Sequence, residues 1–473
     1  MAGGSFVGLD IGSNQIKVAE LRRSGSQLQV VAMGVAPTPL EAYDKSEIVD
    51  PQLLGTAVKN LLKQAGITSR DVVSSVSGQS AVVVRVIEVP QMNQSELAET
   101  MKWEVERHVP FATSEMVIDW TPIDRPEGYA EGQNMEVLLA VAQQDMIDRH
   151  VEMLAAAGLK AKSIDVEPLA VCRTLLDIDP NQSQPGHTVT ILNIGASYTE
   201  VGIYRDKLLA FPRTLPVAGE NLTRAIAQGL GVDLATAENY KREYGEVILD
   251  QFGGAGAQPD FGGGGGFNSP GFQDFSAPAG NPFGAPPDPF AAPAPGGPMP
   301  FEFSTPGDAI PQPTGAPLDV YEAPAAPAPA HAENLPATPS SADPVRDALR
   351  IQVFSAMAPV IAEIAQEVRR SLDYYRGRAG DAHINEILLV GGTAKLKNLD
   401  KFLEMELGIP TRVADALHNV QITAKSVSAQ YAQDLAPVFP ISVGLGLRDL
   451  VTDPNASKGK SKAKAKTKSA KKK

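Results

Sequence analysis

The sequence predicts an α/β fold of two related halves that hold a ligand between them. The stretch 6–21 reads FVGLDIGSNQIKVAEL, where apolar residues alternate on both sides of a Gly-Ser-Asn turn, as in a β-hairpin. The stretch 189–204 reads VTILNIGASYTEVGIY and aligns with the first position by position, so that Asp10 corresponds to Asn193. Two such hairpins in one chain suggest a duplicated α/β domain.

The first hairpin carries groups that suit a phosphate. Backbone N–H groups at its turn, formed by Gly12, Ser13 and Asn14, make a concave anion site. Lys17 could add a positive charge to the phosphate, and Asp10 could hold the accompanying hydrated Mg²⁺. An ordinary tight hairpin is the alternative for this stretch alone, and its recurrence favours the ligand-binding interpretation.

The composition excludes several classes of protein. The chain has 473 residues and a formal net charge of −13, although the tail from Ser457 is rich in lysine, so general nucleic-acid binding is not expected. Cys172 is the single cysteine, which excludes disulfides and thiolate metal clusters. We find no stretch that approaches the apolar length of a membrane span and no signal-peptide pattern, and therefore expect a cytoplasmic protein.

Two segments lack the composition of a folded core. From Glu243 through Val345 there is no Lys or Arg, and Pro, Gly and Ala dominate. Such a sequence cannot bury enough apolar surface to offset its ordering entropy. We therefore expect a disordered insert at about 246–342 and a disordered, Lys-rich tail at 453–473.

Strands and helices alternate in the first half. After the first hairpin the patterns predict strands at 28–35, 72–76 and 80–89 and a helix at 53–65, which Gly66 ends. A second helix begins at Asn93 or Ser95 and is closed by Pro110. Strands at 116–121 and 135–141 and a helix at 145–157 follow. We interpret 80–163 as a small α+β subdomain inserted into the first half.

The second half continues the alternation after its hairpin. One helix begins at Gly219 or Asn221, and Asp233 caps the next. Beyond the insert comes a long helical pattern, which Pro359 should kink or split. A strand at 384–390 then runs into Gly391-Gly392-Thr393, where glycines allow the backbone to approach a ligand closely. Helical patterns follow at 397–407 and 440–450.

These motifs resemble known families. The two hairpins resemble the phosphate motifs of the actin–Hsp70–sugar-kinase superfamily of ATP-binding proteins. The series VSSVSG…VRVIEVP…SELAETMKWEVERHVPF is more specific, and resembles the PilM family of type IV pilus assembly proteins, which are related to FtsA. The resemblance covers nearly all of 1–245 and 343–450.

The resemblance implies an actin-like (ribonuclease H-like, duplicated) two-lobe ATPase fold with an FtsA/PilM-type inserted subdomain. The first lobe would span 1–185, with the chain returning to it at 440–452. The second lobe would span 186–439.

The resemblance also implies Mg-ATP as cofactor. On the phosphate and metal side we expect Asp10, Gly12, Ser13, Asn14 and Lys17, with Asn193, Gly195 and Ala196 opposite. On the nucleoside side we expect Gly391, Gly392 and Thr393 as the adenosine motif, with Glu220, Glu238 and Lys241 near the ribose and base. A surface ion pair is the alternative for Glu238 and Lys241.

Two residues bear on catalysis. Glu167 could place the metal or the attacking water, or could simply be an acid at a helix N-terminus. The family usually has aspartate where this chain has Asn193, and an amide brings no negative charge and cannot act as a base. We therefore expect ATP binding with weak or no hydrolysis.

The resemblance implies a cytoplasmic ATP-binding scaffold of the type IV pilus or a related secretion machine. It would bind the N-terminal peptide of a PilN-like inner-membrane protein, contact other platform proteins, and reach the inner membrane through these partners. A homo-oligomer is compatible with the family. The alternative is an FtsA-like division filament, but the lysine tail lacks the bulky apolar residues of the membrane helix that this alternative requires. A sugar kinase would need a catalytic base beside a sugar pocket, and we find no such motif.

Overall fold

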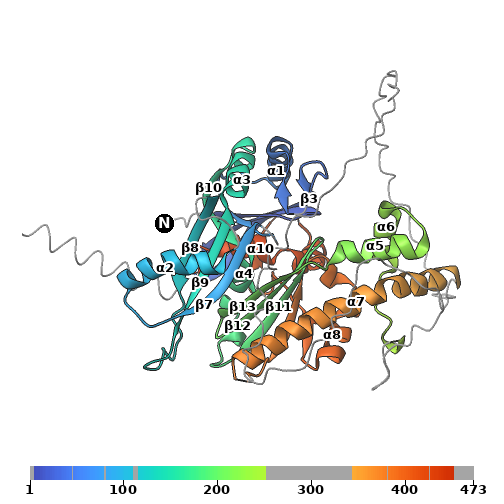
Figure 1. Cartoon of the computed structure of the whole chain (residues 1–473). Coiled ribbons are helices and arrows are strands. Elements are labelled where there is room, and N and C mark those ends of the chain that lie inside the picture. The colour runs from blue at the N-terminus through green and yellow to red at the C-terminus, as the bar shows by residue number, and fades with distance from the viewer. Residues whose placement is uncertain are drawn as a thin grey trace, which may run out of the picture. The chain divides into compact units, whose positions relative to one another are not determined.

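Two β-sheets with matching strand order form the centre of the molecule (Figure 1). The first has the order β10-β6-β1-β2-β3-β16 and the second the order β13-β12-β11-β14-β15. In each sheet an antiparallel meander of three strands is followed by a strand parallel to the first of them. This repeated topology confirms the duplicated α/β fold. The first-sheet strands are β1 (Phe6–Ile11), β2 (Gln15–Ser24), β3 (Gln27–Pro37), β6 (Asp71–Val76), β10 (Lys160–Val166) and β16 (Gln421–Ile422), and the second-sheet strands are β11 (Thr188–Ile194), β12 (Thr199–Arg205), β13 (Leu208–Leu215), β14 (Glu386–Val390) and β15 (Thr411–Val413).

The computed structural model describes residues 5–44, 46–78, 81–109, 115–251, 344–380, 382–424 and 427–451. The insert expected at about 246–342 lies outside these residues from 252 onward, as do the lysine tail and Pro110. The short elements of the described part are β4 (Tyr43–Asp44), β5 (Glu47–Ile48), a π-helical turn (Arg173–Asp177), α9 (Ala429–Leu435) and 3₁₀ turns at Pro180–Gln182, Leu249–Gln251, Thr393–Lys395 and Ala436–Val438.

Helices α1 (Pro51–Ala65) and α3 (Gln144–Ala156) pack together on the first lobe. Asp50 caps α1 by accepting from the backbone of Gln52 and Leu53, and Gly66 ends the helix with a φ of 74°. The apolar face of α1, with Leu54, Val58 and Leu61, joins the core that β1 and β2 also form.

Helices α4 (Glu167–Cys172) and α10 (Pro440–Leu447) pack against each other. This packing requires glycine, because a Cβ on Gly444 would lie 1.8 Å from the carbonyl oxygen of Ala170, and a Cβ on Gly8 would lie 1.9 Å from that of Ser442. The close approach joins α10 both to β1 and to α4. The helices are therefore held at backbone distance at this crossing.

The second lobe carries α5 (Gly219–Leu230), α6 (Leu234–Tyr244), α7 (Pro344–Arg378) and α8 (Leu399–Leu407). Helix α7 continues through Pro359, so the expected split does not occur. Its buried side, which includes Val353, Ile361 and Val368, packs the helix on the lobe and supports it across the proline. The helix is long enough to cross a membrane and its most apolar stretch has a mean hydropathy of 1.4, so the expectation that no stretch approaches a span was wrong. In the structure this apolar side is packed within the second lobe.

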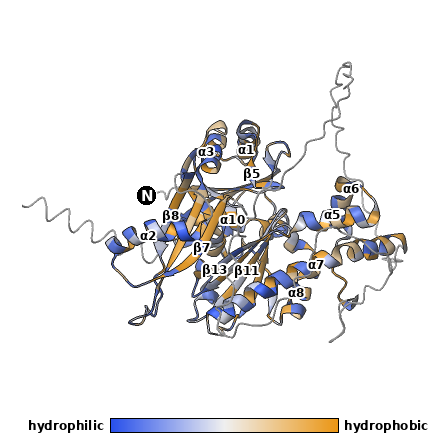
Figure 2. Cartoon of the chain, viewed as in Figure 1, coloured by the Kyte–Doolittle hydropathy of each residue, from blue (hydrophilic) through white to orange (hydrophobic). Residues whose placement is uncertain are grey.

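The inserted subdomain consists of β7 (Val82–Val89), α2 (Gln94–His108), β8 (Met116–Pro122) and β9 (Met135–Gln143), with the sheet order β7-β9-β8. Its strands are largely apolar, and α2 turns a hydrophilic side outward (Figure 2). Asn93 begins α2 through a capping box with Glu96. The bounds 80–163 expected from the sequence are too wide, because α3 packs on α1 and β10 pairs with β6 of the first lobe.

Candidate functional site

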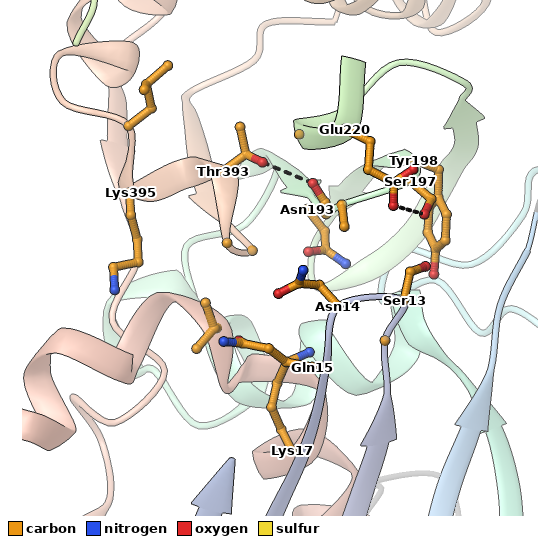
Figure 3. A pocket seen from close by; sticks show the side chains of 18 of the residues that line it. Ser13, Asn14, Gln15, Lys17, Asn193, Ser197, Tyr198, Glu220, Thr393 and Lys395 are labelled. Atoms are coloured by element: carbon orange, nitrogen blue, oxygen red, sulfur yellow. Dashed lines mark hydrogen bonds between the residues drawn. The ribbon is translucent and has the colours of Figure 1, made fainter. Parts of the chain in front are cut away.

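A cavity of about 490 Å³ lies between the two hairpins (Figure 3). All fifteen residues that the sequence indicated line it, contributed by both lobes and by stretches nearly 400 positions apart. Those residues are Asp10, Gly12, Ser13, Asn14, Lys17, Glu167, Asn193, Gly195, Ala196, Glu220, Glu238, Lys241, Gly391, Gly392 and Thr393. The fold thus brings them to one place, and their roles toward a ligand stay predictions.

The first hairpin holds an ion pair at its base. Asp10 on β1 is directly opposite Lys17 on β2, and Lys17 Nζ lies 2.8 Å from Asp10 Oδ2. The turn is closed by the Gly12 N–H, which donates to the carbonyl of Gln15 over 3.1 Å. Thr38 holds the turn from outside, since its hydroxyl donates to the carbonyl of Gly12 over 2.6 Å. Lys17 therefore lies at the cavity wall with its charge partly neutralised.

The second hairpin repeats this turn and anchors the neighbouring segments. The Gly195 N–H donates to the carbonyl of Tyr198 over 3.1 Å, as in the first hairpin. The Gly195 carbonyl accepts from the Thr393 hydroxyl at 2.9 Å and from the Gly219 N–H at 3.1 Å. These bonds join the hairpin to the Gly-Gly-Thr turn and to the start of α5.

Gly391 is required where β14 passes the second hairpin. Its φ is +92°, and a Cβ at this position would lie 2.4 Å from the carbonyl oxygen of Ile194 and 2.8 Å from Asn193 Oδ1. Gly392, by contrast, has open space around it. The close approach thus depends on the first glycine of the turn.

Glu167 is a buried acid that faces the cavity from the start of α4. Its Oε1 accepts from the hydroxyl of Tyr198 at 3.2 Å, and Asn193 Nδ2 lies 3.5 Å from its Oε2. Burial, and next the charge of Asp10, raise the pKa of Glu167 to about 7. Glu167 is therefore the first residue of a helix and also lines the cavity, and its role toward a metal or a water stays a prediction.

On the nucleoside side, Lys241 and Glu238 form the ion pair that was the alternative interpretation, with 2.6 Å between Lys241 Nζ and Glu238 Oε2. Lys241 also donates to the carbonyl of Gly219 over 3.0 Å. Both residues still line the cavity. Glu220 accepts from the hydroxyl of Ser197 over 2.9 Å (Figure 3).

The sequence interpretation missed several wall residues: Gln15, Ser197, Tyr198, Arg242 and Lys395. It also missed Glu200, which is opposite Asn193 in the strand register. Glu200 could have been found by extending the alignment of the two hairpins, in which it falls on Lys17. Tyr198 reaches Glu167 only through tertiary packing, and no local pattern pointed to it.

The described part of the chain contains no group of three or more His, Cys, Asp or Glu side chains placed to hold a metal ion. A hydrated Mg²⁺ uses one or two carboxylates together with waters and phosphate oxygens rather than a full protein cage. Asp10 is the carboxylate beside the first turn.

The repeated sheets, the facing hairpins and the cavity between them define an actin-like, two-lobed protein. The solved structure titled PilM-PilN type IV pilus biogenesis complex superposes with a TM-score of 0.65 at 24% identity, covering 94% of this chain and 98% of that one. A family model described as type IV pilus assembly protein PilM matches residues 8–247. The chain belongs to the PilM family, as the sequence predicted.

A second model, described as cell division protein FtsA, matches residues 190–433. Similar curated proteins include FtsA of Streptococcus pneumoniae, 26% identical, covering 52% of this chain and 56% of the relative. FtsA of Bacillus subtilis is 23% identical, and the match covers 52% of this chain and 59% of the relative. The chain thus spans little more than half the length of these relatives.

Proposed function

We propose that this protein is a nucleotide-binding scaffold of a type IV pilus or related secretion platform, which binds Mg-ATP between its lobes and hydrolyses it weakly or not at all. The observation that carries the proposal is the meeting of both hairpins and the Gly-Gly-Thr turn at one cavity. Its volume lies within the range of small-molecule sites.

The phosphates would lie between the two turns. Backbone N–H groups around Ser13 and Asn14, with the Lys17 ammonium, supply donors and positive charge from the first lobe. Gly195 and Ala196 supply close backbone approach from the second. Asp10 would hold Mg²⁺ through water, and the bound ion would neutralise phosphate charge.

The nucleoside would lie against the Gly391–Thr393 turn and α5. The open surface at Gly392 allows a flat group to approach the backbone. Glu220 and Glu238 are the acceptors on this side for ribose hydroxyls. Lys241, held by its ion pair with Glu238, would keep that carboxylate in place.

We expect weak hydrolysis because Asn193, which lies beside the proposed phosphate site, carries an amide and not an acid. The Asn193 amide cannot take a proton from water. Glu167, whose pKa burial raises to about 7, is partly protonated at neutral pH, so that only part of the molecules carries its carboxylate. Bound ATP would then act mainly by favouring the lobe arrangement that binds it better.

The partner would be the N-terminal peptide of a PilN-like inner-membrane protein, docked near the inserted subdomain. Membership in the PilM family and the PilM–PilN title of the similar structure support this assignment. The subdomain carries exposed apolar side chains at Trp103 (70% exposed), Val117 and Ile118, which suit an apolar peptide. Binding there would hold the protein, with other platform proteins, at the cytoplasmic face of the inner membrane, and a homo-oligomer is compatible with it.

Equilibrium titration of Mg-ATP and Mg-ADP, with a hydrolysis assay, tests the nucleotide part. We expect micromolar binding with little turnover, and loss of binding in Lys17→Ala. Absence of binding in the unmodified protein would contradict the proposal.

The partner part has its own test. A fluorescent peptide from the cytoplasmic N-terminus of the organism's PilN-like protein should bind, and Trp103→Ser should weaken it about tenfold. Leu234→Ser, an exposed apolar residue on α6, is the matched control. Equal loss in both variants would contradict docking at the subdomain.

The second candidate function is an FtsA-like filament protein, which the FtsA match over residues 190–433 favours. Electron microscopy with ATP on anionic lipid monolayers separates the two. Regular filaments that form without any pilus protein would favour this candidate.

A further inference from the structure

Glu200 and Asn193 form a pair that mirrors Asp10 and Lys17. The two hairpins have turns of equal length, and the register sets Asn193 opposite Glu200 as it sets Asp10 opposite Lys17. In the first hairpin the acid is on the first strand and a cation faces it. In the second hairpin the acid is on the second strand and an amide faces it.

The Asn193 amide is placed to serve two acids at once. Its Nδ2 lies 3.5 Å from Glu167 Oε2, and the strand register places Asn193 opposite Glu200. The Asn193 Oδ1 faces Gly391, and a Cβ built on Gly391 would lie 2.8 Å from this oxygen. Burial, and next the charge of Glu167, raise the pKa of Glu200 well above its usual range. The amide therefore supplies donors to a cluster that is otherwise rich in acceptors.

An aspartate at position 193 would not fit this cluster. It would place a further acid beside Glu167 and Glu200, whose pKa values burial already raises, and it would remove the N–H groups that the Asn193 amide offers. Lys17, whose positive charge lowers the pKa of Glu167, is already paired with Asp10. Uncompensated like charges in a buried site are strongly unfavourable.

We propose that Glu200 is a positioning residue of the nucleotide site and supplies the carboxyl group of the second hairpin on β12. Asn193 is its matched donor, and the Asn193 amide holds Glu200 and Glu167 beside the proposed phosphate site. In the second hairpin the acid has thus moved from the first strand to the second, and replacing Asn193 alone by aspartate impairs the site. The role toward nucleotide rests on the proposed function.

The first test is a double-mutant cycle in the full chain by chemical unfolding at pH 7.5. Asn193→Asp should raise the unfolding equilibrium constant about tenfold or more, and adding Glu200→Gln should bring it back to within about threefold of the parent. Glu363→Gln, an exposed position on α7, should change nothing. An Asn193→Asp variant as stable as the parent, or no rescue by Glu200→Gln, would overturn the pairing.

The second test measures a property that a purely structural pair would not change. The ratio of the ATP Kd in EDTA to that in Mg²⁺ reports how well the site holds the ion beside the phosphates. Glu200→Gln should lower this ratio about fivefold, and Asn193→Asp with Glu200→Gln should keep it within about twofold of the parent. An unchanged ratio in Glu200→Gln would overturn the positioning role. If the parent binds no ATP, the proposed function and the positioning role both fail, and the unfolding cycle still decides the pairing.

Discussion

Lys17 Nζ lies 2.8 Å from Asp10 Oδ2 across the first hairpin, with the two side chains 14% and 2% exposed. The pair does two things at the cavity wall: it keeps a buried carboxylate compensated, and it places an ammonium group at the proposed phosphate site. These contributions can be separated by substitution.

Lys17→Ala should lower the free energy of unfolding by about 2–3 kcal/mol, because it leaves Asp10 buried without its partner. Asp10→Asn with Lys17→Met removes both charges and should recover most of this stability. Urea unfolding measures both. Neither variant should bind Mg-ATP, and tight binding by the neutral pair would contradict the role of Lys17.

Stability should depend on pH through Glu167. Its folded pKa of about 7 exceeds the usual 4.5, so the folded state binds more protons than the unfolded state between these values. Ionised Glu167 therefore lowers the free energy of unfolding, with no penalty below pH 4.5 and a full penalty, at most about 3 kcal/mol, above pH 7. Glu167→Gln should abolish this decline, which urea unfolding measures between pH 4.5 and 7 as the difference in stability between parent and variant.

His150 should act with the opposite sign. It is buried on α3 with Nε2 3.0 Å from the hydroxyl of Ser74, and burial lowers its pKa to about 4 from the usual 6.5. Below pH 6.5 the unfolded chain takes up the proton first, so stability is lost as pH falls from 6.5 toward 4. His150→Gln should remove this loss, measured as the difference in stability between parent and variant from pH 6.5 to 4, and it should expose the opposite effect of Glu167 in the overlapping range.

The two glycines of the Gly-Gly-Thr turn should differ sharply. Gly391→Ala places a methyl group 2.4 Å from the Ile194 carbonyl oxygen at a φ of +92°, and should cost more than about 2 kcal/mol and disturb the cavity. Gly392→Ala meets nothing within 4 Å and should be tolerated. Thermal unfolding distinguishes them, and equal effects would contradict the close approach.

The crossing of α4 and α10 should be equally intolerant. Gly444→Ala would force α10 away from the Ala170 carbonyl, and we expect a loss of more than about 2 kcal/mol. Gly377→Ala, exposed near the end of α7 with open space around it, should stabilise by up to about 1 kcal/mol. The same unfolding assay compares the two helical positions.

Much of the fold and site followed from local sequence. Period-2 alternation and turn residues identified both hairpins, because strand faces and turn geometry depend on neighbouring residues. The capping residues Asp50, Asn93 and Asp233 act within one turn, and Asn93 and Asp233 were recognised from sequence alone. The prediction that Gly12, Gly195 and Gly391 face one ligand stays to be tested, but they do line one cavity.

The rest was decided by tertiary packing. Whether β10 belongs to the subdomain or to the first lobe depends on its pairing with β6, which no local pattern encodes. Helix α7 continues through Pro359 because its apolar side is packed against the second lobe. The sequence by itself determined which residue types stand at the hairpins. Only the folded chain brought Glu167, Asn193 and Glu200 together, where the pKa values of the two acids depend on each other.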